Sequence, residues 1–373
     1  NLDGLKSALY EGRGTSPTDD EARQLIQFIR GVDAYDANID GNVTEQRHWK
    51  LADIYHSEMA IVGPPEKVDS KKAVDTNTEA YYKETNGFQA FVNANTIRTS
   101  VVYVGANDGM LHAFDDTTGE ELWAFIPPNM LPNLREMKTS VENTTIPIYG
   151  VDGSPVVKDI YYGGQWHSVL MAGLGRDRYG YFALDVTTPE TPKFLFAFSN
   201  DPENKVVRHW GPDGSLTKQT YSASGEFNYS KLGEAWSTPT IIAMPYGSAR
   251  KWVAAIGGGF NSNQNQNTAS AVYLIDLANN GKVLKLTDLT DSPEGFINST
   301  PAQLTAVTPD STAVAQYKGA FLYFTDIEGK LSKINLTNAG QLHGITELFD
   351  GKGNLVNQRA ATFPVTASSD ANG

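Results

Sequence analysis

The spacing of apolar residues changes near residue 31. Before that point it repeats every three to four residues, which is typical of an amphipathic helix. One short helix is predicted from the spacing of Leu2, Leu5 and Leu9 and ends near Gly12. A second is predicted from Ser16 as N-cap and Pro17 as first helical residue, and it stops at Gly31. Beyond this point only strands and turns are expected.

Apolar runs beyond residue 100 come in pairs that are joined by glycine-containing turns. The clearest pair is 101–105 and 110–115, connected by Asn107-Asp108-Gly109 and followed by a third run at 121–125. Asn-Asp-Gly between two apolar runs is a strong hairpin signal. The same unit recurs as 169–173 with 180–185, 252–256 with 271–276, and 321–324 with 329–335.

A second repeated feature is a small residue and a proline placed directly before an apolar run. It occurs at 153–157, 237–241, 299–302 and 362–365, and successive prolines are 84, 62 and 63 residues apart. Each repeat predicts one antiparallel sheet of about four strands, which cannot bury both of its faces alone. Radial stacking of such sheets buries them, so the predicted fold is an all-β propeller.

These spacings exceed the roughly 40–50 residues of an ordinary propeller blade. Inserted loops are therefore expected near 65–98, 127–150, 199–234 and 260–268. The predicted organisation is a helical lead-in with a metal loop at 1–50, belonging to the same domain as a propeller at 51–373. Because the chain opens without a signal peptide, in what reads as the middle of a domain, we expect a mature segment or a fragment.

Composition narrows the function classes. The 373 residues carry 30 basic and 43 acidic side chains, a net charge of −13, which argues against a broad nucleic-acid footprint. The chain has no cysteine, so a disulfide framework, a cysteine-zinc site and a thiol nucleophile are excluded. No apolar stretch is long enough to span a bilayer.

One acidic segment has the spacing of a calcium loop. In 36–47, Asp36, Asn38 and Asp40 alternate like the first, third and fifth positions of an EF-hand, and Gly41 stands at the sixth, where the chain turns sharply. Calcium prefers six to eight oxygen ligands. The full predicted set is Asp36, Asn38, Asp40, Asn42 through its carbonyl, Thr44 and Glu45.

The twelfth position departs from that pattern. It holds Arg47 where an EF-hand has a bidentate glutamate, and Glu45 is the expected substitute, with Asp33 and Asp53 in reserve. The alternative is a solvated acidic turn with no ion.

Other polar and aromatic residues point to structure. The six histidines show no metal spacing, and those at 112 and 167 lie in strand patterns, where packing or hydrogen bonding is expected. The six tryptophans are expected to pack between sheets, although Trp210, in an insertion, is a candidate for exposure. Gly257-Gly258-Gly259 leads into Asn and Gln residues instead of a helix, so it predicts a turn and not a phosphate loop.

The stretch 103–115, together with 49–57, 152–155 with 166–170, and 180–186, resembles the C-terminal propeller of the PilC/PilY family of type IV pilus-associated proteins. The resemblance covers about 15–370. It implies a modified quinoprotein-like β-propeller at the surface of a Gram-negative bacterium, at the outer membrane or pilus tip. In that family an Asp-rich loop inside the propeller binds calcium, but 308–313 of this chain, around Asp310, is poor in acids.

The function that the resemblance implies is a non-enzymatic one in pilus biogenesis, adhesion and the balance of pilus extension and retraction. The implied partners are pilin subunits or pilus machinery and a host-cell receptor, and Ca²⁺ is the expected cofactor. Two alternatives stay open. One is a scaffold or glycan-binding propeller, which exposed Tyr and Trp residues on 199–234 would favour. The other is a quinone-dependent dehydrogenase, which the absence of adjacent cysteines disfavours.

Overall fold

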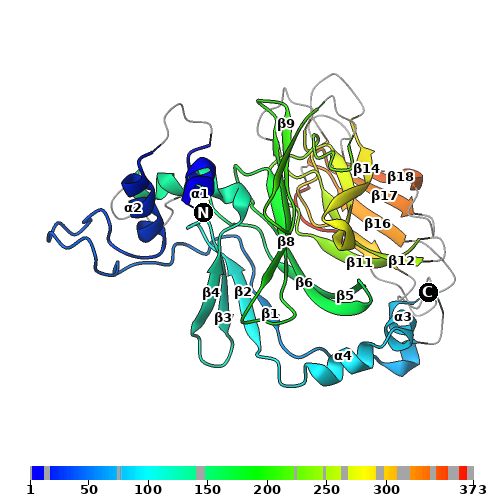
Figure 1. Ribbon diagram of the computed structural model, residues 1–373. Helices are drawn as coiled ribbons and strands as arrows, with labels where there is room; N and C mark the ends of the chain where they lie inside the picture. The colour runs from blue at the N-terminus through cyan, green and yellow to red at the C-terminus, as the bar shows by residue number, and fades with distance from the viewer. Residues whose placement is uncertain are drawn as a thin grey trace.

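Four antiparallel sheets follow one another along the chain in the computed structural model (Figure 1). It describes residues 2–11, 17–73, 76, 78–139, 148–221, 225–246, 249–261, 268–290, 298–308, 320–336, 342–351 and 361–367. In each sheet the strands pair in sequence order, every strand with the next one in the chain. This arrangement is the repeating unit that the sequence predicts.

The strands divide into sheets as follows. Sheet 1 contains β1 (Ala60–Val62), β2 (Val101–Gly105), β3 (Leu111–Asp115) and β4 (Glu121–Phe125). Sheet 2 contains β5 (Val156–Tyr162), β6 (Gln165–Gly173), β7 (Gly180–Asp185), β8 (Lys193–Asp201), β9 (Val206–Trp210) and β10 (Leu216–Thr220). Sheet 3 contains β11 (Thr240–Tyr246), β12 (Ala249–Gly257), β13 (Ala271–Asp276) and β14 (Lys282–Asp288). Sheet 4 contains β15 (Thr305–Val307), β16 (Ala320–Thr325), β17 (Lys330–Leu336) and β18 (Leu342–Asp350).

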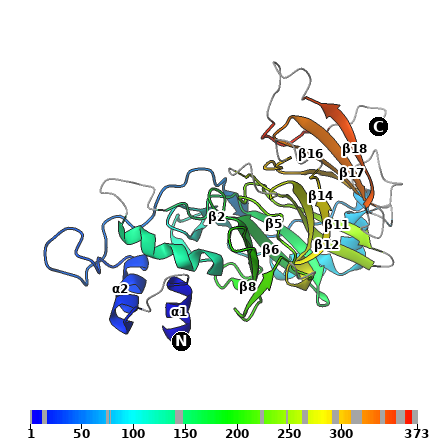
Figure 2. The same cartoon turned by 90° about the horizontal axis from the view of Figure 1, so that it is seen from above.

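The first strands of the sheets lie next to one another. β5 contacts β1 on one side and β11 on the other, and β11 contacts β15. Seen from above, the sheets succeed each other across the molecule (Figure 2). This stacking around the first strands is the geometry of propeller blades.

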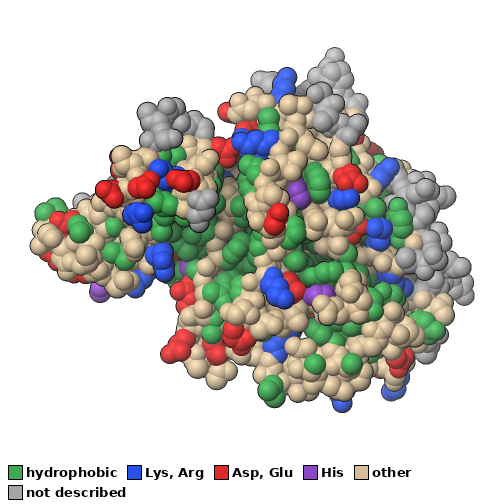
Figure 3. Space-filling model, viewed as in Figure 1, with side chains coloured by type: hydrophobic (Ala, Val, Ile, Leu, Met, Phe, Trp, Pro, Cys, Tyr) green, Lys and Arg blue, Asp and Glu red, His purple; other side chains and the backbone are tan. Residues whose placement is uncertain are grey.

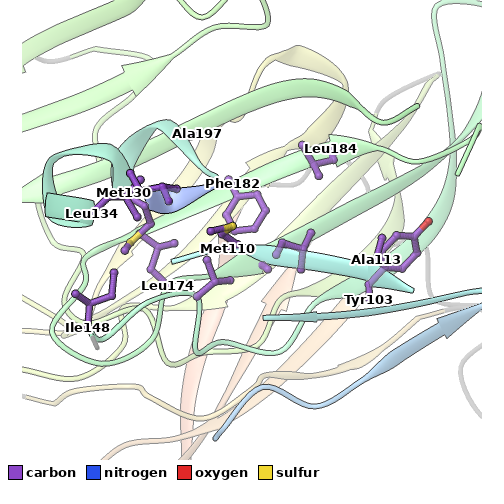
Figure 4. Packing of buried hydrophobic residues seen from close by; sticks show 14 of the residues in the cluster. Tyr103, Met110, Ala113, Met130, Leu134, Ile148, Leu174, Phe182, Leu184 and Ala197 are labelled. Atoms are coloured by element: carbon purple, nitrogen blue, oxygen red, sulfur yellow. The ribbon is translucent and has the colours of Figure 1, made fainter. Parts of the chain in front are cut away.

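Three layers of apolar side chains fill the spaces between neighbouring sheets. The layer between sheets 1 and 2 includes Tyr103, Leu111 and Phe182. Figure 4 shows Met130 and Leu134, from the segment after β4, in the same cluster as Phe182. Trp252 and Tyr273 belong to the layer between sheets 2 and 3. A third layer, between sheets 3 and 4, completes the core.

Strands in the middle sheets do not alternate between polar and apolar residues, and β13 shows why. In β13, Tyr273 and Ile275 pack toward sheet 2, whereas Val272 and Leu274 pack toward sheet 4. All six residues of this strand are buried, because both faces are covered. In β16 of sheet 4 buried residues alternate with partly exposed ones, since one face alone packs against a sheet.

Glycine is required where one sheet meets the next. Gly105, Gly173 and Gly257 end the second strand of sheets 1, 2 and 3. A Cβ atom on them would lie 2.1, 2.4 and 2.1 Å from a backbone carbonyl oxygen of the following connecting segment. The close approach of two backbones leaves no room for a side chain there.

The N-terminal helices are α1 (Leu2–Leu9) and α2 (Asp19–Ile29). The predicted start of the second one was wrong: Thr18, not Ser16, is its N-cap. Its hydroxyl accepts the Glu21 N–H at 3.2 Å, and the Glu21 carboxylate accepts the Thr18 N–H at 2.8 Å. This reciprocal pair satisfies two N–H groups that Ser16 would leave open. Leu9 and Leu25 join the core layer of sheets 1 and 2.

The expectation of strands and turns alone beyond residue 31 was also wrong. The insertion at 65–98 contains η1 (Ser70–Lys72), α3 (Glu79–Thr85) and α4 (Phe88–Ala94), and the one at 127–150 contains η2 (Pro128–Thr139); η3 (Leu277–Asn279) follows β13. Phe88 and Val92 of α4 are buried against sheets 2 and 3. Their short apolar spacing is hidden in a polar, charged stretch, so only packing reveals it.

The insertion at 199–234 extends sheet 2. Its strands β9 and β10 add two strands beyond the predicted four. Trp210 is buried, with 7% of its surface exposed, and so is Tyr229, which removes the exposed aromatic cluster that would have favoured glycan binding there. Trp49 is the opposite case: it was expected to pack between sheets and is 72% exposed. Most of the insertion at 260–268, and Asp310, lie outside the described residues.

Two surface properties bear on partners. No helix among the described residues is both long and apolar enough to cross a membrane. On the face shown in Figure 3, Lys and Arg side chains lie singly or in small groups among Asp and Glu.

Candidate metal-binding loop

The candidate loop leaves the body of the protein directly after α2 and projects from its side at the left of Figure 1. Its two ends are held together by backbone hydrogen bonds. The Asp33 N–H donates to the Glu45 carbonyl at 2.8 Å, and the Arg47 N–H donates to the Gly31 carbonyl at 2.7 Å. These bonds close a loop around 34–44 and fix the distance between its ends.

Inside this loop, side-chain oxygens accept hydrogen bonds from the backbone. An Asp36 carboxylate oxygen accepts the N–H groups of Asp40 at 2.9 Å and Gly41 at 3.1 Å. The Asp40 carboxylate accepts the Asn42 N–H at 2.8 Å. Such bonds bend the chain around the side chains, as alternating Asp and Asn residues in a tight turn do. Gly41 has a φ of 82°, a conformation that favours glycine.

Glu45 points back toward the middle of the loop. Its Oε1 atom accepts a hydrogen bond from the Asn38 amide at 2.6 Å, and the same amide lies 3.2 Å from Asp40 Oδ2. Asn42 Oδ1 accepts from the Thr44 hydroxyl at 2.9 Å. All six residues of the predicted set therefore lie in one hydrogen-bonded loop, and each carries an oxygen of the kind that calcium accepts.

The carboxylates of this loop do not yet surround a common point. Across the described part of the chain, no group of three or more His, Asp or Glu side chains is arranged to hold a metal ion. The Asn38 amide nitrogen stands between Asp40 and Glu45. If the Asn38 side chain rotated so that its amide oxygen pointed inward, an ion would occupy the position between Asp40 and Glu45 that the amide nitrogen now fills. The donor chemistry of the loop fits calcium after this rotation.

Three neighbouring residues have structural roles. The Arg47 guanidinium lies 4.2 Å from the centre of the Phe28 ring, so the residue at the twelfth position joins the base of the loop to α2. Asp33 is buried, and its carboxylate accepts the Ala37 N–H at 2.9 Å. Asp53 lies with sheet 1, where its carbonyl accepts the Asn107 N–H. Asp33 thus lies at the base of the loop and Asp53 outside it, and their role as reserve ligands stays a prediction.

The strand histidines are hydrogen-bonded, as expected. His112 in β3 is buried between Asp108, 3.1 Å away, and Glu121, 2.6 Å away. Burial lowers the pKa of His112, but hydrogen bonds and charge attraction from the two carboxylates outweigh burial and raise it overall. His167 lies 2.8 Å from Asp185.

Sequence reasoning missed one pair. His56 Nδ1 lies 2.6 Å from Oδ2 of the buried Asp152, although the two residues are 96 positions apart. No sequence motif relates them, because His56 lies in the segment that leads into sheet 1 and Asp152 in the segment that leads into sheet 2. A clue was present in the sequence, because both residues lie in segments that carry the family resemblance, and each segment leads into the first strand of a sheet.

Antiparallel sheets of four or six strands, paired in sequence order and stacked around their first strands, define a β-propeller protein. The family described as the PilY1 beta-propeller domain matches residues 51–349. The chain belongs to this family, as the resemblance predicted.

Curated relatives are longer than this chain. The type IV pilus biogenesis factor PilY1 of Pseudomonas aeruginosa strain UCBPP-PA14 is 30% identical over 341 residues, which are 90% of this chain and 25% of the relative. A PilY1 homolog of Xylella fastidiosa strain Temecula1 is 34% identical over 197 residues, 52% of this chain and 15% of the relative. The chain thus spans about a quarter or less of these proteins. The crystal structure of the Pseudomonas aeruginosa PilY1 C-terminal domain aligns with a TM-score of 0.47 and 26% identity over 74% of this chain and 45% of that one.

Proposed function

We propose that this chain is the calcium-responsive propeller of a type IV pilus biogenesis factor. It acts without catalysis at the surface of a Gram-negative bacterium, where it contacts pilin subunits or the pilus machinery and contributes to adhesion to a host-cell receptor. The names of the relatives support the pilus role. The observation that carries the calcium part is the closed loop that gathers six oxygen-bearing residues directly before the family domain begins at residue 51.

Calcium would act by favouring one conformation of the loop. An ion binds the ordered loop and not a disordered one, so occupancy shifts the equilibrium toward order. The loop is anchored to α2 through Arg47 and Phe28, and α2 packs in the core layer of sheets 1 and 2. A change of order in the loop therefore reaches a surface next to sheet 1, and we place the calcium-dependent partner contact there.

The test is calcium titration by calorimetry into metal-free protein. We expect one site in the wild type and at least a tenfold loss of affinity in Asp36→Asn and Asp40→Asn, because each change removes one charged ligand. Asp213→Asn is the matched control, since this exposed aspartate also accepts hydrogen bonds within a turn, from Ser215, but lies in the β9–β10 connection. Binding that is equal in all four proteins refutes the assignment to the loop.

A second readout tests the pilus role itself. The same substitutions in the full-length parent protein are expected to change the number of surface pili, whereas the control is not. Wild-type piliation in variants that have lost calcium binding would refute the coupling between the loop and the pilus.

A further inference from the structure

A small pocket lies where the segments leading into the first three sheets converge. It has a volume of about 360 Å³, near the lower limit of ligand-binding pockets, so it suits one small ring rather than an extended ligand. Its lining comes from the segments before β1 and β11, the β6–β7 connection and the segment after β12. The lining residues are His56, Arg176, Asp177, Glu234, Trp236 and Phe260.

The imidazole of His56 is fixed from two sides. Its Nδ1 lies 2.6 Å from one carboxylate oxygen of the buried Asp152, and the other oxygen accepts the His56 backbone N–H at 2.9 Å. The carboxylate accepts, so Nδ1 donates and the opposite nitrogen, Nε2, is left for a ligand. The ring also meets Trp236 edge to face, with centroids 5.0 Å apart at 90°.

Three other lining side chains, Trp236, Glu234 and Arg176, also have partners. The Trp236 indole N–H donates to the carboxylate of Glu234, which is buried, at 3.0 Å. Backbone hydrogen bonds of 2.7 and 3.1 Å join Glu234 and Phe260. The Arg176 guanidinium lies 4.5 Å from the centre of the Tyr149 ring. A site whose side chains are already held loses little entropy when a ligand binds.

The chemistry of the lining selects the ligand. A simple anion would meet the carboxylates of Asp177 and Glu234, and a simple cation would meet Arg176. A neutral ligand with several hydroxyl groups can donate to the carboxylates and accept from the guanidinium. Its apolar C–H face can rest on the rings of Trp236 and Phe260. We propose that this pocket binds one neutral pyranose ring of a saccharide.

The proposal is tested by saturation-transfer NMR on calcium-free protein, so that it does not depend on the loop. The probes are the methyl glycosides of glucose, galactose, mannose and N-acetylglucosamine at about 10 mM, which detects dissociation constants near 1 mM. We expect at least one of them to receive saturation. We expect about tenfold weaker binding in Arg176→Met and Asp177→Asn, because each loses a hydrogen bond to a charged group.

The controls separate this site from weak surface contacts. Arg176 and Asp177 are exposed, so both variants are expected to keep the wild-type melting temperature. Trp49→Phe removes an exposed indole outside the pocket and is expected to bind like the wild type. Absence of transfer to all four glycosides, or equal transfer in wild type and pocket variants, overturns the proposal. Tighter binding of inorganic phosphate or methylammonium also overturns it, in favour of a charged ligand.

Discussion

Replacing His112 by glutamine removes a positive charge from between two carboxylates in sheet 1. Asp108, one of the two, is 1% exposed, whereas the side chain of Glu121 is 46% exposed. Removing one partner of a buried ion pair costs about 3–5 kcal/mol, since the other charge stays buried. Glutamine can still donate one hydrogen bond to Asp108, so we expect the lower end, about 3 kcal/mol at pH 6.

This loss depends on pH in a defined direction. The pKa of His112 in the folded protein is raised above its ordinary value of 6.5, so protonation stabilises the fold. That contribution is fully present below pH 6.5 and is lost as the pH rises through the folded-state pKa. Once the pH exceeds the folded-state pKa the imidazole is neutral, and the difference from the variant is expected to shrink to about 1 kcal/mol, the value of a neutral hydrogen bond.

The assay is urea unfolding of wild type and His112→Gln at pH 6 and pH 9, followed by circular dichroism. Glu121→Gln is the control: it removes the exposed partner and is expected to cost less than about 1 kcal/mol. A destabilisation by His112→Gln that is the same at both pH values, or larger at pH 9, would show that His112 is not held protonated by its carboxylates.

Two further substitutions test the packing and the charges of the fold. Gly257→Ala is expected to destabilise by several kcal/mol, because the new Cβ would lie 2.1 Å from the Thr300 carbonyl oxygen, whereas Gly63→Ala meets its nearest neighbour at an ordinary 3.6 Å and is expected to change the melting temperature little. Burial, the largest cause, raises the pKa of Asp326 to about 6, so its ionised form opposes folding above that pH. Asp326→Asn keeps an oxygen for the N–H of Lys330 and is expected to stabilise the protein by about 1–2 kcal/mol at pH 8 and not at pH 3.5, measured by urea unfolding.

Features that depend on neighbouring residues were predicted from the sequence, whereas features that depend on residues far apart in the chain were not. The Asn-Asp-Gly turn and its flanking strands followed from neighbouring residues, because a hairpin joins segments that are adjacent in the chain. The six residues of the 36–45 loop were likewise named from spacing, and the structure places them in one hydrogen-bonded loop. Whether this loop binds calcium stays a prediction that the titration tests.

Helix α4 and Trp49 show where local patterns failed. The apolar residues of α4 span only two turns inside a polar stretch, and Phe88 and Val92 are buried because sheets 2 and 3 lie opposite. Trp49 has the large apolar side chain that is typical of a core residue, yet it lies exposed in a segment that runs along the surface. Burial depends on what packs against a residue, and spacing alone does not contain that information.

The sequence by itself determined the repeating antiparallel units, the helical N-terminal segment and the position of the acidic loop, because each depends on residues close together in the chain. Tertiary structure alone decided that β9 and β10 extend sheet 2, that Gly105, Gly173 and Gly257 stand at backbone contacts, and that His56 meets Asp152. The physical reason is stacking: a propeller brings the connections of successive sheets together around their first strands, and joins residues that no local pattern relates.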